Sequence, residues 1–272
     1  MHLADGVGGI FPRRSEMMED NKKPLVSVIM PAYNAACFLE EAVRSVMAQT
    51  VTDWELLILD DGSKDDTARL AAALAAEDAR IRFLPNERNM GVARTRNRGF
   101  DLCRGQYVAL LDSDDVWLPE KLEKQLALAQ AVGADIVYCS YGIMDSRSLP
   151  SRRDYLVANH VELKQLLLEN CIGCSTVLLG RRVVDQYRFE VDFYHEDYVL
   201  WLRLLQDGFR AAGCTEVLVH WRLLENSRSF DKRRSAKNRW LIYRNYLKLP
   251  VWKSAWYFAG YTVAGLRKYL SK

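Results

Sequence analysis

The sequence predicts an α/β fold, with a Rossmann-like, mostly parallel sheet flanked by helices. From Pro24 to about Gly133, apolar runs typical of buried strands alternate with helix-like segments. Apolar runs spaced by helices indicate a parallel sheet that is covered on both faces. In such sheets, ligands bind beyond the carboxyl ends of the strands. Polar clusters follow three of the predicted strands, so a binding site is expected along that edge.

The predicted strands and helices follow one another in a regular order in the first half of the chain. Strands are predicted over residues 25–30, 54–59, 81–84 and 106–111, with helices over 38–49 and 67–77 and from about Val92. Apolar side chains recur on one face of the helix over 38–49, at Leu39, Val43, Val46 and Met47. After Gly133 the alternation is looser, with strands over 135–141, 176–179 and 215–223 and helices over 161–170 and from about Glu196.

Charge is distributed unevenly along the 272 residues, although the net charge is only +3. Residues 228–272 contain twelve Lys and Arg against one Asp, a charge of +11. The remaining 26 basic and 34 acidic residues give residues 1–227 a charge of −8. A basic tail on an acidic body indicates an anionic partner surface, either a membrane or a nucleic acid.

The cysteines and the N-terminus favour a cytoplasmic protein. Cys171 and Cys174 have neither a second CxxC nor a His pair at zinc spacing, so reduced thiols are expected rather than a metal site. Residues 1–23 lack the apolar core of a signal peptide and are predicted to be disordered. No segment reaches the ~20 apolar residues that span a bilayer, and the nearest, residues 254–266, is too short.

The most informative segment is an apolar, strand-like run that is followed by Asp112, Ser113, Asp114 and Asp115. Carboxylates are costly to bury without partners. Such oxygen ligands suit a hard divalent cation that also holds phosphate. A solvated turn or a helix N-cap is the simpler explanation, and Asp115, ahead of Pro119, is expected to be such a cap. Asp112 and Asp114 are then left to bind a cation.

Two other strand ends carry side chains that fit a nucleotide. Tyr33, between Pro31 and Asn34 after the first strand, can stack on a base, and Asp61 after the second strand can accept from a base N–H group. Strand ends often carry Tyr and Asp for turn formation, so either residue alone is weak support. Neither GxGxxG nor GxxxxGKS/T is present, so phosphate recognition is expected through a metal and side chains.

Two predicted helix starts add polar groups near the same edge. One helix opens with Arg94, Arg96 and Asn97. A solvated arginine explains Arg94 equally well, whereas Arg96 and Asn97 are expected to brace a diphosphate or the acidic edge. Glu196 and Asp197 begin a later helix, where acids complement the helix dipole. A carboxylate at that position that faces the site is also a natural general base.

Taken together, these motifs resemble a family 2 glycosyltransferase with the GT-A fold. Five segments match in the family's order and spacing, at residues 26–34, 60–67, 89–97, 111–119 and 196–197. The resemblance covers roughly residues 24–225. Residues 172–177 and 221–227, with the basic tail, resemble the bacterial branch that builds teichuronic acid, O-antigen and related polysaccharides.

The resemblance implies how a donor would be held. Tyr33 and Asp61 match positions that hold the uracil of a UDP-sugar, with Pro31 and Asn34 beside them. The sequence Asp112-Ser113-Asp114 matches the DxD motif of the family. Asp114 is the principal implied ligand to Mg²⁺ or Mn²⁺ on the diphosphate, and Asp112 is the second.

The resemblance also implies a catalytic base and a mechanism. Asp197 matches the base, with Glu196 beside it shaping the site, and the reaction is a single displacement with inversion in which Asp197 takes the proton of the acceptor hydroxyl. Many relatives carry a His where this chain has Leu224, and His220 is an uncertain substitute. Diphosphate and water are then expected to complete the coordination of the metal.

The resemblance divides the chain into an N-terminal extension (1–23), a GT-A domain (24–225) and a basic, aromatic, helical tail (226–272). One helical stripe of the tail contains Trp252, Trp256, Ala259, Val263, Leu266 and Leu270. A basic cluster beside an amphipathic helix suits an anionic leaflet, where an undecaprenyl-diphosphate-linked saccharide acceptor would be presented. Packing of the tail on the body is the alternative. The expected location is cytoplasmic, peripheral at the inner face of the cell membrane.

Other functions fit parts of the sequence. Asp112 and Asp114 also fit the DxDxT/V motif of aspartyl-phosphate phosphatases, but that motif belongs on a first strand and its later Asp pair is missing. A non-catalytic module could bind a membrane or a nucleic acid through the basic tail, whereas a transferase needs no nucleic acid beyond its nucleotide-sugar. A sugar-nucleotide pyrophosphorylase is disfavoured because its Gly-rich nucleotide loop is not found.

Overall fold

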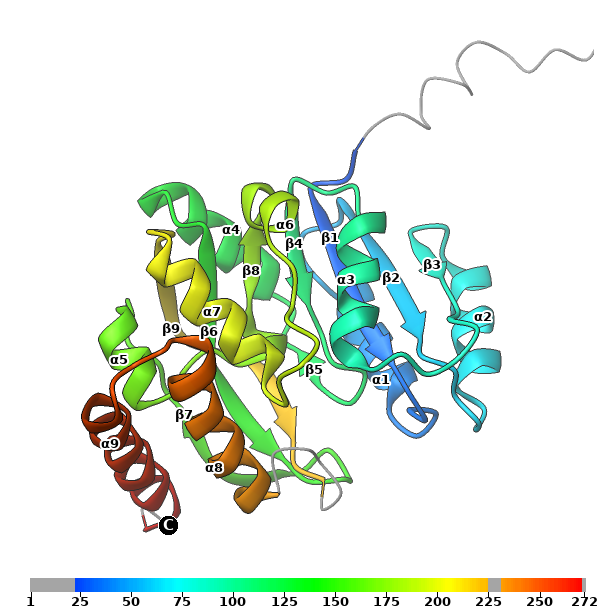
Figure 1. Ribbon diagram of the computed structural model, residues 1–272. Helices are drawn as coiled ribbons and strands as arrows, with labels where there is room; N and C mark the ends of the chain where they lie inside the picture. The colour runs from blue at the N-terminus through cyan, green and yellow to red at the C-terminus, as the bar shows by residue number, and fades with distance from the viewer. Residues whose placement is uncertain (1–22, 225–230, 271–272) are drawn as a thin grey trace, which may run out of the picture.

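The computed structural model describes residues 23–224 and 231–270 (Figure 1). Within these residues, one sheet of nine strands has the order β3-β2-β1-β4-β8-β6-β9-β5, with β7 paired to β6. The strands are β1 (Val26–Ala32), β2 (Trp54–Asp60), β3 (Ile81–Phe83), β4 (Tyr107–Leu110), β5 (Val116–Trp117), β6 (Ile136–Met144), β7 (Pro150–Tyr155), β8 (Leu178–Gly180) and β9 (Ala211–Arg222). The predicted α/β fold with a mostly parallel sheet is confirmed. The predicted disorder of residues 1–23 concerns a segment that, apart from Lys23, lies outside the described residues.

The first four strands are parallel and are covered by helices on both faces. β1 pairs in parallel with β2 on one side and with β4 on the other. Because successive side chains of a strand point to opposite faces, Ile29 lies in the core cluster of α3 (Val92–Leu102) and Val28 in the cluster of α1 (Leu39–Met47). Two further helices, α2 (Thr67–Glu77) and α4 (Lys121–Val132), contribute to the cluster of α1.

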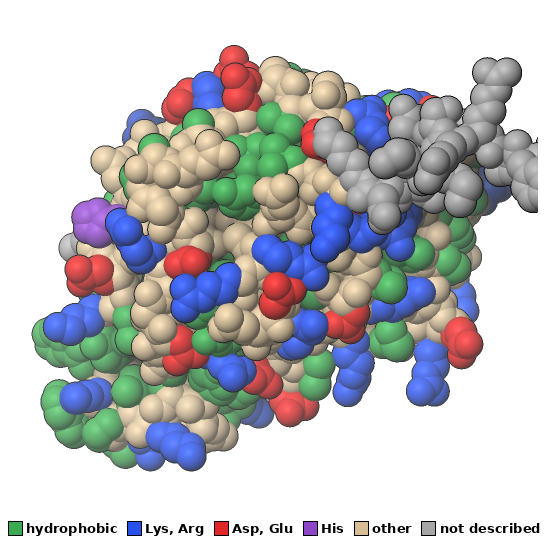
Figure 2. Space-filling model, turned by 90° about the horizontal axis from the view of Figure 1, so that it is seen from above, with side chains coloured by type: hydrophobic (Ala, Val, Ile, Leu, Met, Phe, Trp, Pro, Cys, Tyr) green, Lys and Arg blue, Asp and Glu red, His purple; other side chains and the backbone are tan. Residues whose placement is uncertain are grey.

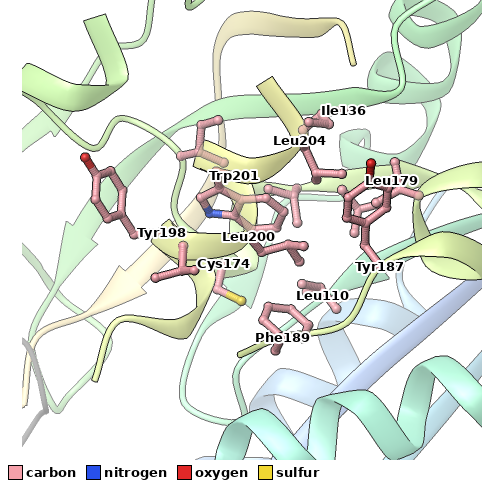
Figure 3. Packing of buried hydrophobic residues seen from close by; sticks show 14 of the residues in the cluster. Leu110, Ile136, Cys174, Leu179, Tyr187, Phe189, Tyr198, Leu200, Trp201 and Leu204 are labelled. Carbon is pink, nitrogen blue, oxygen red and sulfur yellow. The ribbon is translucent and has the colours of Figure 1, made fainter. Parts of the chain in front are cut away.

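The larger core cluster surrounds α7 (Glu196–Gln206), the helix that begins with the two candidate acids. Figure 3 shows Leu200, Trp201 and Leu204 of this helix among the side chains of the sheet, which include Leu110 of β4 and Ile136 of β6. The short helices α5 (Leu163–Leu168) and α6 (Arg181–Gln186) belong to the same cluster. Burial of this kind fixes the N-terminus of α7 relative to the sheet.

The C-terminal part consists of α8 (Lys232–Leu241), a π-helical turn, η4 (Ile242–Tyr246), and α9 (Val251–Leu270). Ile242 and Tyr243 are fully buried in the cluster of α7, and the Tyr243 hydroxyl donates to the Leu167 carbonyl at 2.5 Å. η4 is therefore part of the core, with α8 leading into it. In the described part of the chain, no helix is long and apolar enough to cross a membrane.

Three short elements were not expected from the sequence, namely β5, β7 and α6. β7 consists almost entirely of exposed residues and contains Pro150 and two arginines, so it lacks the apolar pattern of a strand. β5 has only two residues, which is too short for a periodic signal. Both are held in place by pairing with longer strands, β6 and β9.

Candidate active site at the carboxyl edge of the sheet

A pocket of about 900 Å³ opens at the carboxyl ends of β1, β2 and β4. Most of the predicted site residues line it, namely Pro31, Tyr33, Asp61, Arg96, Asp112, Ser113, Asp114, Glu196 and Asp197. Asn34 and Asn97 are not among its lining residues. Parallel strands place their carboxyl ends at one edge, which is why residues so far apart in the sequence converge there.

The acidic loop, residues 112–115, begins shortly after β4, and all four of its residues line the pocket. Asp112 and Asp114 are partly exposed to it. Partial removal from water raises the pKa of Asp114 to about 6, and the negative charge of Asp112 adds to the rise. The pair therefore concentrates negative charge that a cation would offset.

Asp115 has a different role from the helix N-cap that the sequence suggested. It is buried, its Oδ2 accepts from the Ser175 hydroxyl at 2.5 Å and its Oδ1 accepts from the Arg222 backbone N–H at 2.9 Å. α4 begins only at Lys121, because β5 separates Asp115 from the helix. Burial, and then the charges of the two other carboxylates of the loop, raise the pKa of Asp115 well above its usual range. The cap prediction was wrong, and Asp115 instead connects the acidic loop to its surroundings.

Arg222, at the end of β9, supports the acidic loop and is almost completely buried. Its Nε donates to the Asp114 carbonyl at 2.7 Å, and its Nη2 pairs with Glu41 of α1 at 2.6 Å. Its Nη1 donates to the Asp145 carbonyl at 3.1 Å and to the Ser148 hydroxyl at 3.0 Å. One side chain thus connects the acidic loop to α1 and to the turn between β6 and β7.

Arg96, on α3, joins the acidic loop to the start of α7. Its Nη2 pairs with Asp112 at 2.5 Å and its Nη1 pairs with Glu196 at 2.7 Å. The side chains of Arg96 and Glu196 are 5% and 3% exposed, so this is a buried ion pair. Arg96 therefore braces the acidic edge, one of the two roles expected of it.

Asp197 lies next to Glu196 in the first turn of α7 and is only partly buried. The neighbouring acids are thus distinguished by their surroundings. The Glu196 carboxylate accepts from Arg96 within the core, whereas Asp197 lines the pocket with part of its surface exposed. A carboxylate at that position has access to a hydroxyl that enters the pocket.

On the β1 and β2 side of the pocket, Asp61 organises the loop before α3. Its Oδ1 accepts from the Asn86 amide and the Met90 N–H, both at 2.8 Å, and its Oδ2 accepts from the Gly91 N–H at 2.8 Å. Oδ1 thus has both of its acceptor sites occupied, whereas Oδ2 keeps one for a further donor. Tyr33 stands beside it with 49% of its surface exposed, which leaves its ring accessible to a ligand.

Asn34 and Asn97, both predicted to contact the donor, form hydrogen bonds within the fold instead. The Asn34 side chain accepts from the Lys64 N–H at 2.8 Å, and Asn34 itself has a left-handed backbone with φ of 50°. The Asn97 amide donates to the Phe189 carbonyl at 2.9 Å and accepts from the Phe189 N–H at 2.7 Å.

Sequence reasoning missed two residues that shape the site, Ser175 and Arg222. The Ser175 hydroxyl accepts from the Asp112 N–H at 3.0 Å while it donates to Asp115, so it clamps both ends of the acidic loop. A serine in an irregular segment carries no periodic signal that would reveal this contact. The sequence places Arg222 only within the motif over residues 221–227. Its partners in the core include Ser148 and Glu41, which lie 74 and 181 residues away in the sequence.

The position at which the family resemblance implied a third metal ligand carries no coordinating group in this pocket. Leu224 lines the pocket at that position, and an alkyl side chain cannot coordinate a cation. Trp221 of β9 lines the pocket, and adjacent residues of a strand point to opposite faces of the sheet. The preceding residue, His220, therefore points away from the pocket and is not among its lining residues. Among the described residues, no group of three or more His, Cys, Asp or Glu side chains is arranged to hold a metal.

Comparison with known proteins decides the family. The model of glycosyl transferase family 2 matches residues 27–189, which include β1, the acidic loop and Arg96. The chain belongs to this family. It is a glycosyltransferase.

Two relatives in this family align over nearly the whole chain. A putative teichuronic acid biosynthesis glycosyltransferase of Bacillus subtilis, TuaG, is 36% identical over 250 residues, which cover 92% of this chain and 99% of the relative. An Escherichia coli protein, WfgD, is 36% identical over 248 residues, 90% of this chain and 95% of its own. WfgD is described as a UDP-Glc:α-D-GlcNAc-diphosphoundecaprenol β-1,3-glucosyltransferase.

Solved structures agree on the GT-A fold. S. aureus TarS in complex with UDP-GlcNAc has a TM-score of 0.66 at 17% identity, covering 87% of this chain and 71% of that one. The mannosyltransferase PcManGT of Pyrobaculum calidifontis, in complex with GDP-Man and Mn²⁺, has a TM-score of 0.67 at 15% identity, covering 93% and 77%.

Proposed function

We propose that this glycosyltransferase is an inverting, metal-dependent enzyme that moves a sugar from a UDP-sugar to a lipid-linked saccharide in surface polysaccharide biosynthesis. The observation that carries the proposal is the bridge made by Arg96. It pairs with Asp112 of the acidic loop and with Glu196, the neighbour of Asp197. The candidate metal ligands and the candidate base are thereby fixed around one pocket.

The acidic loop fits a divalent cation such as Mg²⁺ or Mn²⁺. Asp112 and Asp114 offer hard oxygen ligands, and burial, together with the negative charge of Asp112, raises the pKa of Asp114. A bound cation would supply positive charge to the diphosphate of the departing nucleotide. Because Leu224 cannot serve as a ligand, the protein would hold the cation through these two carboxylates alone.

Support for a uridine nucleotide comes from Tyr33, Asp61 and the relatives. The exposed ring of Tyr33 can stack on a base, and Oδ2 of Asp61, which accepts only from the Gly91 N–H, can accept from a base N–H group. WfgD is named for UDP-Glc, and TarS is known in complex with UDP-GlcNAc. PcManGT is known with GDP-Man, so the choice of base in this chain needs a direct comparison of nucleotides.

The proposed base is Asp197. It takes the proton of an acceptor hydroxyl as that oxygen attacks the anomeric carbon, and the bond to the nucleotide breaks on the opposite side, which inverts the configuration. Glu196 is less suited to this role, because it is already paired with Arg96 in the core. Glu196 and Arg96 instead hold the start of α7 in place.

A membrane surface is the proposed place of the acceptor. The α9 stripe, Trp252, Trp256, Ala259 and Val263, points away from the body, and its two tryptophans are 69% and 71% exposed. Tyr257 and Phe258, on the other face of α9, pack against the core. The predicted stripe is therefore the outward face, which favours contact with lipid over packing on the body. The side chains of Leu266 and Leu270, predicted for the same stripe, lie outside the described residues.

Basic side chains accompany the α9 stripe. Exposed Lys and Arg residues of α8 and α9 are Lys232, Arg233, Arg234, Lys237 and Lys253, whereas Asp231 is the one acid among the described residues from 231 onwards. Figure 2 shows hydrophobic side chains with Lys and Arg among them at the lower left, the side on which α9 lies in Figure 1. This combination suits the anionic inner face of a cell membrane.

The catalytic unit that we propose extends beyond the sequence boundary at residue 225. Ile242 and Tyr243 are buried with α7, and the Asn238 side chain accepts from the Tyr194 N–H at 3.0 Å, two residues before Glu196. We therefore group residues 24–246 into one unit, with α9 as its peripheral part. Removal of residues 226–272 would then disrupt the enzyme as a whole, not the membrane contact alone.

The two alternatives from the sequence are weaker. Asp112 follows β4, the fourth strand along the chain, whereas the aspartyl-phosphate phosphatase motif belongs on a first strand. A non-catalytic binding module would have no use for the buried bridge that Arg96 builds between the acidic loop and α7.

The test of this function is transfer from UDP-sugars to a GlcNAc-diphosphate lipid by wild-type enzyme, Asp197→Asn and Asp192→Asn. Asp192 is an exposed carboxylate in the same segment and serves as the matched control. We expect Asp197→Asn to lose transfer by ~100-fold or more while UDP affinity is kept. Equal activity of both variants would remove Asp197 as the base, and transfer from GDP-sugars alone would overturn the donor assignment.

A further inference from the structure

The acidic loop divides the pocket into two parts. It follows β4, which in the sheet lies between β1 on one side and β8, β6 and β9 on the other. Tyr33 and Asp61 line the pocket on the side of β1 and β2. Tyr141 of β6 and Trp221 of β9 line it on the opposite side. A nucleotide held by the first part leaves the second part for another ligand.

Tyr141 and Trp221 form what we call the aromatic wall. Their strands pair in parallel, and the Trp221 ring stands edge-on to the Tyr141 ring, with centroids 6.3 Å apart and an interplanar angle of 76°. Tyr155 of β7 stacks on Tyr141 at 5.0 Å and 21°, and the Tyr155 hydroxyl donates to Glu169 at 2.7 Å. The ring of Tyr141 thus contacts two aromatic neighbours, which gives the wall a fixed orientation.

The position of Trp221 is also fixed by the residue that follows it. Arg222 is the buried side chain that connects the acidic loop to α1, so any movement of the wall along β9 would strain those contacts. Both rings of the wall are only partly buried, although large aromatic side chains usually gain stability from full burial. A rigid, partly exposed aromatic surface inside a polar pocket is a feature of ligand sites.

We propose that the aromatic wall is the subsite for a pyranose ring of the acceptor saccharide. The inference rests on the proposed function, because it assumes that the other part of the pocket holds the nucleotide. A pyranose presents an apolar face of C–H bonds and a rim of hydroxyls, and a flat aromatic ring packs against that apolar face while the hydroxyls point elsewhere. Asp197 lines the same pocket and would meet the hydroxyl that reacts.

Ligand-observed NMR with saturation transfer tests the subsite without requiring turnover. The probes are methyl α-N-acetylglucosaminide, which has a pyranose ring, and open-chain N-acetylglucosaminitol, which has none. Both are added to enzyme with UDP and Mg²⁺. We expect saturation to reach the ring protons of the pyranoside and to be absent for the open-chain alcohol.

The variants are Trp221→Ala, Tyr141→Ala, Trp221→Phe and, as the control, Val132→Ala, an exposed apolar residue of α4 that does not line the pocket. We expect each alanine change in the wall to weaken pyranoside binding about tenfold, Trp221→Phe to retain most of it and the control to have no effect. UDP affinity should change less than about twofold in all four. This last readout separates loss of the subsite from collapse of the acidic loop.

Each outcome has a distinct meaning. UDP binding without pyranoside binding in the wild type, or pyranoside binding that survives Trp221→Ala and Tyr141→Ala, would overturn the subsite while the proposed function stands. Parallel loss of UDP and pyranoside binding in the wall variants would also overturn it, because the rings would then be structural. Pyranoside binding without UDP binding in the wild type would support the subsite and overturn the proposed donor.

Discussion

Arg96 and Glu196 are a hundred residues apart in the sequence, yet their side chains pair at 2.7 Å inside the core. Each is almost fully buried, and the same guanidinium reaches Asp112 at 2.5 Å. Two charges that leave water together lose much of their hydration, and their mutual attraction has to compensate for that loss. The pair is therefore costly to break, and it links α3, the acidic loop and α7 in one network.

We expect Arg96→Met to lower the free energy of unfolding by about 3–5 kcal/mol, because it leaves Glu196 buried without its partner. Urea denaturation measures this change. Arg69→Met is the matched control, since the ion pair of Arg69 with Asp66 is exposed and should contribute little to stability. Equal losses in the two variants would show that burial does not govern the Arg96 pair.

Arg222 should control nucleotide affinity through the acidic loop. Arg222→Met removes the hydrogen bond to the Asp114 carbonyl and the pair with Glu41, so the loop loses its support from α1. We expect metal-dependent UDP binding to weaken by at least about tenfold, a change that calorimetry detects. Glu41→Gln is the control, because it keeps every bond between Arg222 and the loop. Unchanged UDP affinity in Arg222→Met would contradict the positioning role.

Lys121 gives the stability a pH dependence that can be isolated. Its side chain is buried, with Nζ donating to Gln125 at 2.7 Å and lying 3.9 Å from the centre of the Trp117 ring. Burial lowers its pKa to about 8, from 10.5. Between these values the unfolded chain binds more protons than the folded one, so the contribution of Lys121 to stability rises with pH.

We expect the unfolding free energy of wild type minus that of Lys121→Met to increase by roughly 2–3 kcal/mol between pH 7.5 and 10.5. Buried cysteines and tyrosines also titrate, and they lower the unfolding free energy at high pH. Because both proteins contain them, their contribution cancels in the difference between the two. Chemical denaturation at several pH values measures it. A flat or falling difference would mean that the buried lysine remains hydrated.

The α9 stripe should determine attachment to lipid. We expect Trp252→Ser with Trp256→Ser to reduce binding to vesicles that contain anionic phospholipid by about tenfold or more. Leu156→Ser is the control, because Leu156 is 69% exposed but lies before α5, outside the stripe. Co-sedimentation with vesicles measures binding. If the double variant binds as well as the wild type and light scattering shows that it has changed from dimer to monomer, the stripe contacts a second copy of the chain instead.

The parallel half of the fold could be predicted because its signals are local. The strands from β1 to β4 are mostly apolar and alternate with helices, so their order fixes which residues meet at the carboxyl edge. For that reason Tyr33, Asp61 and the acidic loop could be predicted to lie along one edge, and all of them line the pocket. Glu196 and Asp197 could be singled out as acids at a predicted helix start, but no local signal places α7 at the site, and their assignment to it came from the family resemblance.

Contacts between distant segments could not be read from the sequence. Asp115 is of a residue type that favours helix N-caps, but its carboxylate accepts hydrogen bonds from Ser175 and Arg222 inside the core. Asn97 was expected at the diphosphate, whereas the backbone of Phe189, 92 residues away, satisfies its amide. In each case a short polar side chain has several possible partners, and only the packing of the whole chain selects one.

The most direct test of the central claim is calorimetry of UDP binding with and without Mn²⁺, for wild type, Asp114→Asn and the exposed control Asp192→Asn. We expect Mn²⁺ to strengthen UDP binding to the wild type and to Asp192→Asn by at least about tenfold, and to leave Asp114→Asn without this gain. UDP binding that is indifferent to Mn²⁺ in the wild type, or fully retained in Asp114→Asn, would contradict a metal site in the acidic loop.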